Sequence, residues 1–168
     1  MKVLGLHTLL HDSGASVIAD GNISSILEAR LSRVKHTGAF PNLSIQYVMD
    51  IHGIKDINEF DVVAVDHLLV KKKSLIENDI RKTGFRGEIQ FIGHHDGHAA
   101  SAFFCSPFDE AAVLIVDGQG SSIHEDSYDQ KANTEQIFDE DAHELQSYYH
   151  GCGNKLKKIH TTFSSDTR

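Results

Sequence analysis

The sequence predicts an α/β domain built on a mixed β-sheet. Residues 2–31 alternate apolar and polar side chains between tight turns, apolar residues recur at helical spacing after Asn42, and continuous apolar runs follow at 61–66 and 88–92. Alternation is typical of strands with one exposed face, whereas uninterrupted apolar runs are typical of buried parallel strands. Together these patterns indicate one sheet that contains both antiparallel and parallel strands.

The first predicted elements form an antiparallel meander, because tight turns join three consecutive strands at residues 2–10, 15–20 and 23–31. A helix is expected from about Asn42, where Ile45, Val48 and Met49 recur at helical spacing and Gly53 suits the C-terminal end.

The remaining elements complete one lobe and begin another. Residues 71–80 fit a helix or a loop, small residues between 96 and 104 suit a helix packed closely on a sheet, and residues 111–118 are the clearest buried strand. A meander followed by a helix and two further strands is the order of a ribonuclease-H-like lobe. Strand 111–118 runs into a glycine-containing turn as the first strand does, so we expect a first lobe over 1–110 and an incomplete second lobe over 111–168. Within the second lobe, residues 121–153 are expected to be loop or partly disordered, and 154–163 a strand.

Composition restricts the class of protein. The 168 residues are 40% hydrophobic and 24% charged, which is typical of one soluble globular chain. The sequence shows neither the pattern of a membrane span nor that of a signal peptide. We therefore expect a cytoplasmic protein without a membrane partner. The net charge of −8 argues against a nucleic-acid partner, although eight acidic residues fall between 125 and 144 alone. Cys105 and Cys152 fit neither a disulfide framework nor a paired-cysteine zinc site.

The strongest candidate site combines His94 and His98 with Asp117. Residues four apart share one helix face, so both imidazoles can face one ion while a carboxylate at a strand end approaches from a third side. This donor set suits Fe(II), Zn(II) or another first-row divalent metal. Such histidine pairs also occur merely as capping or filling groups on a helix, and spacing alone leaves both interpretations open.

The second candidate is the turn His11-Asp12-Ser13-Gly14, which follows the first strand. Its backbone N–H groups could hold an anion, and His11 could act as a general base, although an ordinary hairpin turn has the same residues. Further along, Lys35 and His36 belong to a basic segment that could bind phosphate or could simply be solvated.

Asp117 is followed by Gly118-Gln119-Gly120. These glycines would allow backbone to approach a phosphate or nucleotide, but a Gly-x-Gly alone is weak evidence. Its value comes from its position beside the candidate metal ligand Asp117.

Three segments, GLHTLLHDSGASVIADG, EARLSRVKHTGAFP and HHDGHAASAFFCSPFDEAAVLIVDGQG, resemble in order and spacing the N-terminal region of the O-carbamoyltransferases of antibiotic and nodulation-factor biosynthesis. The resemblance covers roughly residues 1–120. It implies the actin-like fold shared with sugar kinases and a relationship to the tRNA threonylcarbamoyl-transfer proteins. It also implies a biosynthetic transferase with two domains. The resemblance implies that a separate C-terminal domain makes carbamoyladenylate from carbamoyl phosphate and ATP. The N-terminal domain would then transfer the carbamoyl group to a substrate hydroxyl at an iron centre.

The resemblance also implies roles for individual residues. His94 and His98 match two histidine ligands of the metal, Asp117 matches the first carboxylate ligand, and His11 matches the base for the accepting hydroxyl. Contacts to substrate are implied at Asp12, Lys35, His36, Gly118 and Gly120.

The family pattern continues well beyond this chain, and neither a further carboxylate ligand nor the adenylate-forming domain is found in it. We therefore expect the remaining C-terminal polypeptide as a partner and no activity from the 168 residues alone. Two alternatives stay open at this stage: a catalytically silent binding or assembly module that keeps the fold, and a tRNA threonylcarbamoyl-transfer relative. The sequence does not identify the small hydroxyl-bearing acceptor.

Overall fold

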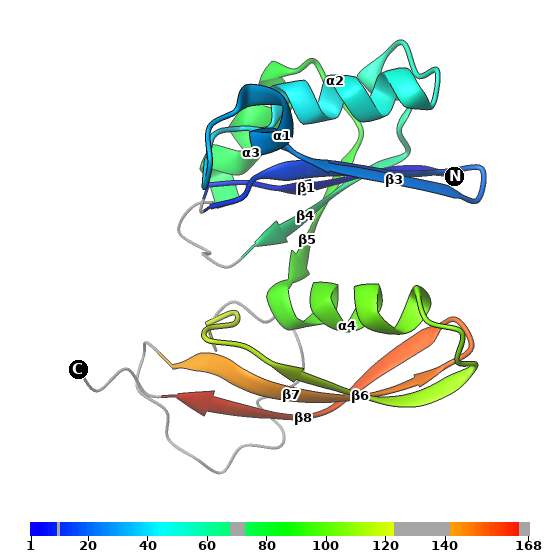
Figure 1. Cartoon of the computed structure of the whole chain (residues 1–168), viewed down its shortest axis with the longest axis vertical. Helices are drawn as coiled ribbons and strands as arrows, with labels where there is room; N and C mark the ends of the chain where they lie inside the picture. The colour runs from blue at the N-terminus through cyan, green and yellow to red at the C-terminus, as the bar shows by residue number, and fades with distance from the viewer. Residues whose placement is uncertain (10, 68–72, 123–141, 165–168) are drawn as a thin grey trace. The chain divides into compact units, whose positions relative to one another are not determined.

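The computed structural model describes residues 1–9, 11–67, 73–122 and 142–164. Residue contacts divide the chain into two units, the first ending at Ile92 and the second beginning at Gly93. The first unit contains β1 (Lys2–His7), β2 (Gly14–Ala19), β3 (Asn22–Leu27), α1 (Glu28–Ser32), α2 (Asn42–Ile51), a 3₁₀ turn (Ile57–Glu59), β4 (Val62–His67), α3 (Lys73–Lys82) and β5 (Glu88–Gly93). The second contains α4 (His94–Phe104), β6 (Glu110–Val116), β7 (His143–Cys152) and β8 (Lys155–Ser164) (Figure 1). No helix in these described ranges is long and apolar enough to cross a membrane.

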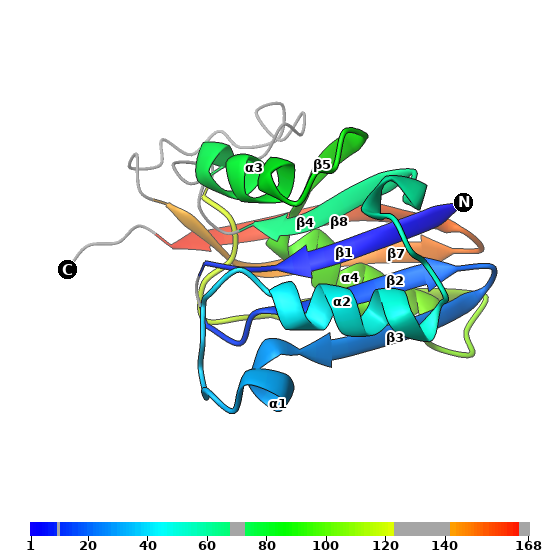
Figure 2. The ribbon, with the colours of Figure 1, turned by 90° about the horizontal axis from the view of Figure 1, so that it is seen from above.

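The first unit is a five-stranded mixed sheet of order β3-β2-β1-β4-β5. β1 pairs with β2, and β2 with β3, in antiparallel register, which confirms the predicted meander. β4 joins the other edge of β1 in parallel, as its apolar sequence predicted. Figure 2 shows β3, β2, β1 and β4 following one another across this sheet. The strand order is that of a ribonuclease-H-like lobe.

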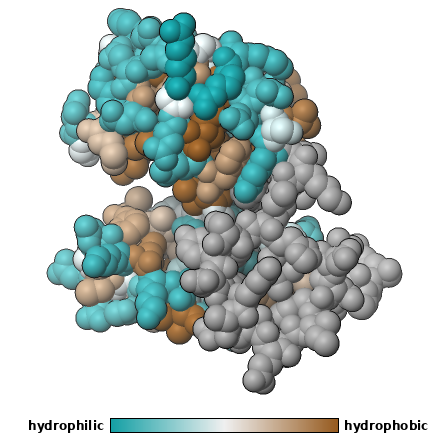
Figure 3. Space-filling view, turned by 180° about the vertical axis from the view of Figure 1, so that it is seen from behind, coloured by the Kyte–Doolittle hydropathy of each residue, from teal (hydrophilic) through white to brown (hydrophobic). Residues whose placement is uncertain are grey.

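The helices of the first unit lie on one face of its sheet (Figure 1). α2 buries Ile45, Val48 and Met49 against that face, and the predicted helix boundary is confirmed because Gly53 adopts a positive φ of 66° just beyond it. The residues Leu4, Val17, Val48, Val63, Ile76, Ile80 and Phe85 form much of the core. The outer side of this helical layer is predominantly hydrophilic (Figure 3), as expected for amphipathic helices.

The third strand ends earlier than the sequence suggested, because Glu28 begins α1 instead of extending β3. Its buried carboxylate accepts hydrogen bonds from the backbone N–H groups of Leu43 and Ser44, at 3.2 and 2.8 Å, and from the Ser44 hydroxyl at 2.7 Å. Pro41, at the N-cap of α2, provides no such bond. Glu28 thus caps α2 from a distance, which compensates N–H groups that would otherwise lack partners.

The second unit is an antiparallel sheet of order β6-β7-β8 with α4 on one face (Figure 1). Its small core includes Ala99 from α4, Ile115 from β6 and Tyr149 from β7. The predicted helix between residues 96 and 104 is confirmed and begins two residues earlier, at His94.

Two sequence expectations about this unit are wrong. Residues 143–152 form the ten-residue strand β7, although we expected loop over 121–153; residues 123–141 lie outside the described part of the chain. β6 is an edge strand of the described sheet, and its residues Leu114 and Val116 are 55% and 65% exposed. The apolar run of β6 looked buried on both faces because its sequence could not show that only one face meets α4.

The structure divides the chain at residue 93, whereas the sequence suggested a lobe boundary near residue 110. The difference concerns α4, whose Phe103 packs so closely on Gly151 of β7 that a Cβ there would lie 2.6 Å from the ring. Because these contacts join α4 to β7, the helix belongs with the strands that follow it.

We expect Ile115→Ala to lower the free energy of unfolding by about 2–4 kcal/mol, since Ile115 is 9% exposed and packs in the core of the second unit. Leu114→Ala, on the opposite side of the same strand, should change it by less than about 0.5 kcal/mol. Urea denaturation of both variants measures the difference. Equal losses would contradict the inward orientation of Ile115.

Candidate metal centre and catalytic loop

His94, His98 and Asp117 converge in the second unit. The Nε2 atom of His94 lies 2.8 Å from Oδ2 of Asp117 and 3.1 Å from Nε2 of His98, and His98 Nε2 lies 3.5 Å from the same oxygen. One donor atom from each residue falls within 4.8 Å of the other two. The structure therefore brings together the three residues that the sequence selected as a candidate metal site.

Local structure explains this convergence. His94 is the first residue of α4 and His98 lies one turn later, so their rings share one helix face. Asp117 follows β6, and its backbone N–H donates to the carbonyl of Leu145 on β7 at 3.1 Å. The backbone N–H of His94 donates to the Ser121 hydroxyl at 3.1 Å, which ties the start of α4 to the same loop.

Asp117 is held as a carboxylate. Burial alone would raise its pKa, but hydrogen bonds from the Gly118 N–H and from His94, with the charges of His94 and His98, lower it below its ordinary value. The side chains of His94, Asp117 and His98 are 15%, 34% and 50% exposed, so the cluster opens to solvent on one side.

The donor set fits a first-row divalent ion. Two imidazole nitrogens and one carboxylate oxygen are typical ligands of Fe(II) and Zn(II), and three protein ligands leave coordination positions for substrate. Whether these residues bind a metal stays a prediction.

The two glycines after Asp117 lie in different surroundings. Gly118 is exposed, and a Cβ there would meet nothing within 4 Å, so a ligand could approach its backbone. Gly120 is buried, and a Cβ there would lie 2.6 Å from Nε2 of His95. Packing therefore explains the glycine at 120, while a substrate contact at either position remains a prediction.

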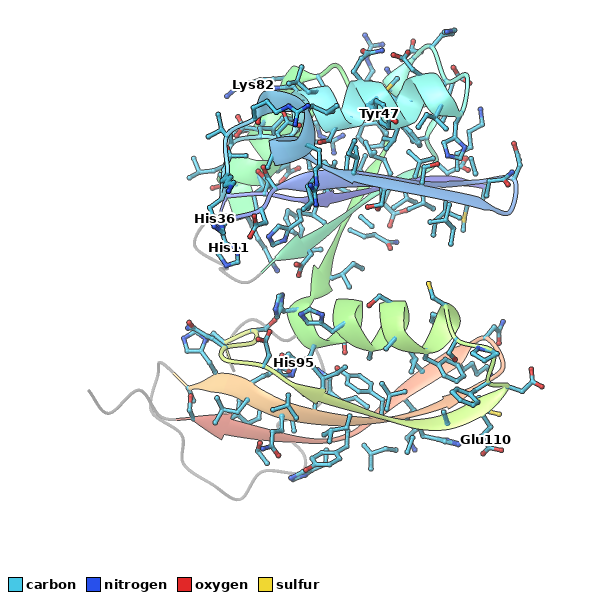
Figure 4. The ribbon with its side chains drawn as sticks, viewed as in Figure 1. His11, His36, Tyr47, Lys82, His95 and Glu110 are labelled. Carbon is cyan, nitrogen blue, oxygen red and sulfur yellow. The ribbon has the colours of Figure 1, made fainter. Side chains whose placement is uncertain are left out.

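His95 lies on the inner side of α4, where Figure 4 shows it between the helix and the sheet. It is fully buried, and its Nδ1 lies 2.7 Å from the Ser147 hydroxyl. Burial, with the nearby cations of His94 and Lys158, lowers its pKa to about 4. His95 is therefore neutral at pH 7 and contributes to the core.

The predicted catalytic loop lies in the first unit, between β1 and β2. Nδ1 of His11 lies 2.9 Å from Oδ2 of Asp12, and Nδ1 of His36 lies 3.5 Å from that oxygen. Figure 4 shows His11 and His36 together at one end of this unit, and Lys35 is exposed beside His36 in the chain. The described contacts thus link His11, Asp12 and His36 in one cluster.

The charges around Asp12 keep it ionised and thereby determine which nitrogen of His11 carries the proton. The hydrogen bond from His11 lowers the pKa of Asp12 more than burial raises it, and His36 lowers it further. Since an ionised carboxylate can only accept, Nδ1 of His11 must carry the proton, and in the neutral ring Nε2 then carries the lone pair. His11 is 73% exposed at its side chain, so this lone pair is available to a substrate hydroxyl.

Sequence reasoning missed two pairs beside these clusters. His7 Nδ1 lies 2.9 Å from Oδ2 of Asp66, and their positions at the ends of neighbouring parallel strands were a usable signal. Glu144, fully buried, lies 2.8 Å from Nζ of Lys158 and accepts from the Ser121 N–H at 3.2 Å. In the sequence, nothing distinguished Glu144 from the other acidic residues between 125 and 144.

Comparison with known proteins identifies relatives. The sequence model of the carbamoyltransferase N-terminus family matches residues 2–70 and 66–156. An uncharacterised protein of Synechocystis sp. is 35% identical over 156 residues, covering 70% of this chain and 25% of that protein. Nodulation protein NolNO of Sinorhizobium fredii is 30% identical over 139 residues, covering 68% of this chain and 20% of NolNO. The chain spans a quarter or less of the length of these curated relatives.

Solved structures support the fold class. An uncharacterised Pseudomonas aeruginosa protein with similarity to peptidase YeaZ superposes with a TM-score of 0.59 at 9% identity, covering 99% of this chain and 68% of that one. YeaZ from the same organism gives a TM-score of 0.53 at 9% identity, with the same coverage. These similarities confirm the ribonuclease-H-like, actin-like fold, and the family match is more specific. The chain belongs to the carbamoyltransferase N-terminus family.

Proposed function

We propose that this chain is the N-terminal portion of an O-carbamoyltransferase that moves a carbamoyl group from carbamoyladenylate to a substrate hydroxyl. Family membership supports a carbamoyltransferase. The observation that carries the finer proposal is the convergence of His94, His98 and Asp117 within 4.8 Å. This donor set suits a metal that must keep positions open for a substrate.

His94, His98 and Asp117 would hold Fe(II) or another first-row divalent ion. Such an ion, when bound, supplies a Lewis acid that polarises the carbamoyl oxygen. The backbone bonds of Asp117 to Leu145 and of His94 to Ser121 hold the ligands in position before an ion arrives. Preorganisation of this kind limits the loss of side-chain freedom on binding.

His11 would remove the proton from the accepting hydroxyl. Asp12 accepts from Nδ1 and so directs the lone pair of the neutral ring to Nε2. A carboxylate also stabilises the imidazolium that forms when the hydroxyl proton arrives, as in other histidine–carboxylate pairs.

Substrate contacts are proposed at residues beside these two clusters. Lys35 and His36 present cationic or hydrogen-bonding groups next to Asp12, which suits an anionic substrate. Gly118 offers an exposed backbone beside Asp117, and Gly120 supports the same loop from the core.

We expect the remaining polypeptide of a full-length family member to make carbamoyladenylate from carbamoyl phosphate and ATP, and the reaction to take place in the cytoplasm. The curated relatives are at least four times as long as the part that this chain matches. In the described part of the second unit, Leu114, Val116 and Tyr148 expose apolar surface on and beside the edge strand β6. Exposed apolar surface and an edge strand both favour association with further chain.

This proposal predicts no carbamoyl transfer by the 168-residue chain with carbamoyl phosphate, ATP and an alcohol, and transfer once the remaining polypeptide is supplied in trans. A carbamoylation assay with radiolabelled carbamoyl phosphate measures both reactions, and the remaining polypeptide alone is the control. Turnover by the chain alone would overturn the division of roles. No turnover by the reconstituted pair, with both parts folded and associated, would instead favour a silent assembly module.

A further inference from the structure

His7 ties the catalytic loop to the neighbouring strand. It is the last residue of β1, and the parallel register that pairs Leu6 with Val65 places it beside Asp66 on β4. Nδ1 of His7 lies 2.9 Å from Oδ2 of Asp66, and Nε2 lies 3.1 Å from the backbone carbonyl of His11. One ring thus contacts both the sheet and the loop that carries His11.

The chemistry of these two partners determines the protonation of the ring. A carbonyl oxygen can only accept a hydrogen bond, and so can an ionised aspartate, whose ordinary pKa is about 3.9. A neutral imidazole carries one N–H and can satisfy only one of two such partners. We infer that His7 is held as an imidazolium and acts as the positioning residue of the His11–Asp12 loop.

Backbone conformation shows why the loop needs this anchor. The His11 carbonyl belongs to the peptide group that precedes Asp12, and Asp12 adopts a φ of 56°. An aspartate adopts this left-handed conformation only occasionally, as a single residue held by local hydrogen bonds. A hydrogen bond from a cation is stronger than a neutral one, so the His7 contact stabilises this peptide orientation.

Neutral backbone hydrogen bonds hold other described residues of the loop. The Leu9 N–H donates to the Gly38 carbonyl at 3.0 Å, the Ser13 N–H donates to the Thr37 carbonyl at 2.9 Å, and the Ser13 carbonyl accepts from the Glu28 N–H at 2.8 Å. The contact to His7 therefore holds the one peptide, between His11 and Asp12, whose two side chains form the proposed base pair.

The described contacts bring four other titratable groups to this end of the sheet, namely Asp66 on β4 and His11, Asp12 and His36 on the two loops. Asp66 contacts His7 directly and favours its charged form. Asp12 engages His11 and His36 instead. Removing the charge of Asp66 should therefore change His7 most.

The inference rests on the proposed function only where it predicts an effect on kcat. The protonation state of the His7 ring can be measured by nuclear magnetic resonance, which needs no enzymatic turnover. In the chain labelled with ¹⁵N, both ring nitrogens of His7 should show protonated shifts at about pH 7.5. His52, a part-buried histidine of the same unit whose Nε2 lies 3.0 Å from the Ser24 hydroxyl, is the internal control. A neutral imidazole shows one protonated and one bare nitrogen, and this is the pattern that would contradict the expected result for His7.

Asp66→Asn supplies the matched variant. Its amide can donate to Nδ1, so His7 should become neutral, keep its proton on Nε2 and still contact the His11 carbonyl. The spectrum of His52 should not change. A bare nitrogen on His7 in the wild-type chain, or two protonated nitrogens in Asp66→Asn, would overturn the inference.

The positioning role is read from His11. In His7→Gln, the His11 ring should lose its fixed Nδ1–H tautomer and show the averaged shifts of a mobile ring, and kcat of the reconstituted enzyme should fall about tenfold or more with little change in KM. Asp66→Asn keeps the contact between His7 Nε2 and the His11 carbonyl, so it should preserve the Nδ1–H tautomer of His11. A change of tautomer in His7→Gln alone would therefore reflect loss of this contact and not general damage to the fold. Unchanged His11 shifts in His7→Gln would overturn the positioning role. If the reconstituted wild type shows no turnover, the proposed function is contradicted. The spectra of His7 and His11 would still test the inference about His7.

Discussion

Replacing His11 by alanine is expected to lower kcat for carbamoyl transfer by roughly 10²- to 10⁴-fold in the reconstituted enzyme, the usual contribution of a general base. The physical reason is the loss of the Nε2 lone pair that Asp12 directs through its 2.9 Å contact with Nδ1. Rates are measured with saturating carbamoyl phosphate, ATP and alcohol. Bound metal should be unchanged, because His11 is assigned the role of base and is not one of the three candidate ligands.

His52→Ala is the matched control, since it removes another histidine of the first unit that has no assigned role in the reaction. It should leave kcat within about twofold of wild type. Full activity in His11→Ala would exclude His11 as the base, and an equal loss in both variants would indicate general damage to the unit.

Replacing His98 by alanine is expected to weaken metal binding by more than about 100-fold. Changes to groups that merely support a ligand already cost about 10- to 100-fold in affinity, so loss of one of three ligands should cost more. Asp117→Asn should also weaken binding, because it removes the charge while keeping the side-chain shape. Elemental analysis after dialysis and a competition titration with a chelator of known affinity measure the effect.

His150→Ala is the control for this experiment, because His150 pairs with Glu110 at 2.8 Å in the same unit and belongs to no proposed site. It should retain the metal content of the wild type. Equal metal content in wild type, His98→Ala and Asp117→Asn would refute the site, whereas loss in all variants including His150→Ala would indicate unfolding.

Much of the first unit could be predicted from local patterns. Alternation predicted β1, β2 and most of β3, and the spacing of Ile45, Val48 and Met49 predicted α2. These patterns succeed because side-chain period and turn chemistry act over only a few residues. The same locality explains the histidine pair, since a spacing of four residues places two rings on one face of any helix.

The second unit shows where local patterns fail. β7 lies partly in an acidic segment, and its Glu144 is buried against Lys158 on β8, fourteen residues away. A buried carboxylate is tolerated because a partner from another strand compensates its charge. The isolated segment reads as exposed loop, since that partner is not part of the local pattern.

By itself, the sequence determined the strands of the first unit and its helix from Asn42, the family resemblance, and the set of residues that could carry the chemistry. Only the tertiary structure decided that α4 belongs with β6, β7 and β8, that β6 is an edge strand of the described sheet, that Gly120 makes room for His95, and that His7 contacts both Asp66 and the His11 loop. The reason is physical. Periodicity records which side of an element is apolar, but strand pairing, packing partners and the charges that face one another depend on contacts between residues distant in the chain.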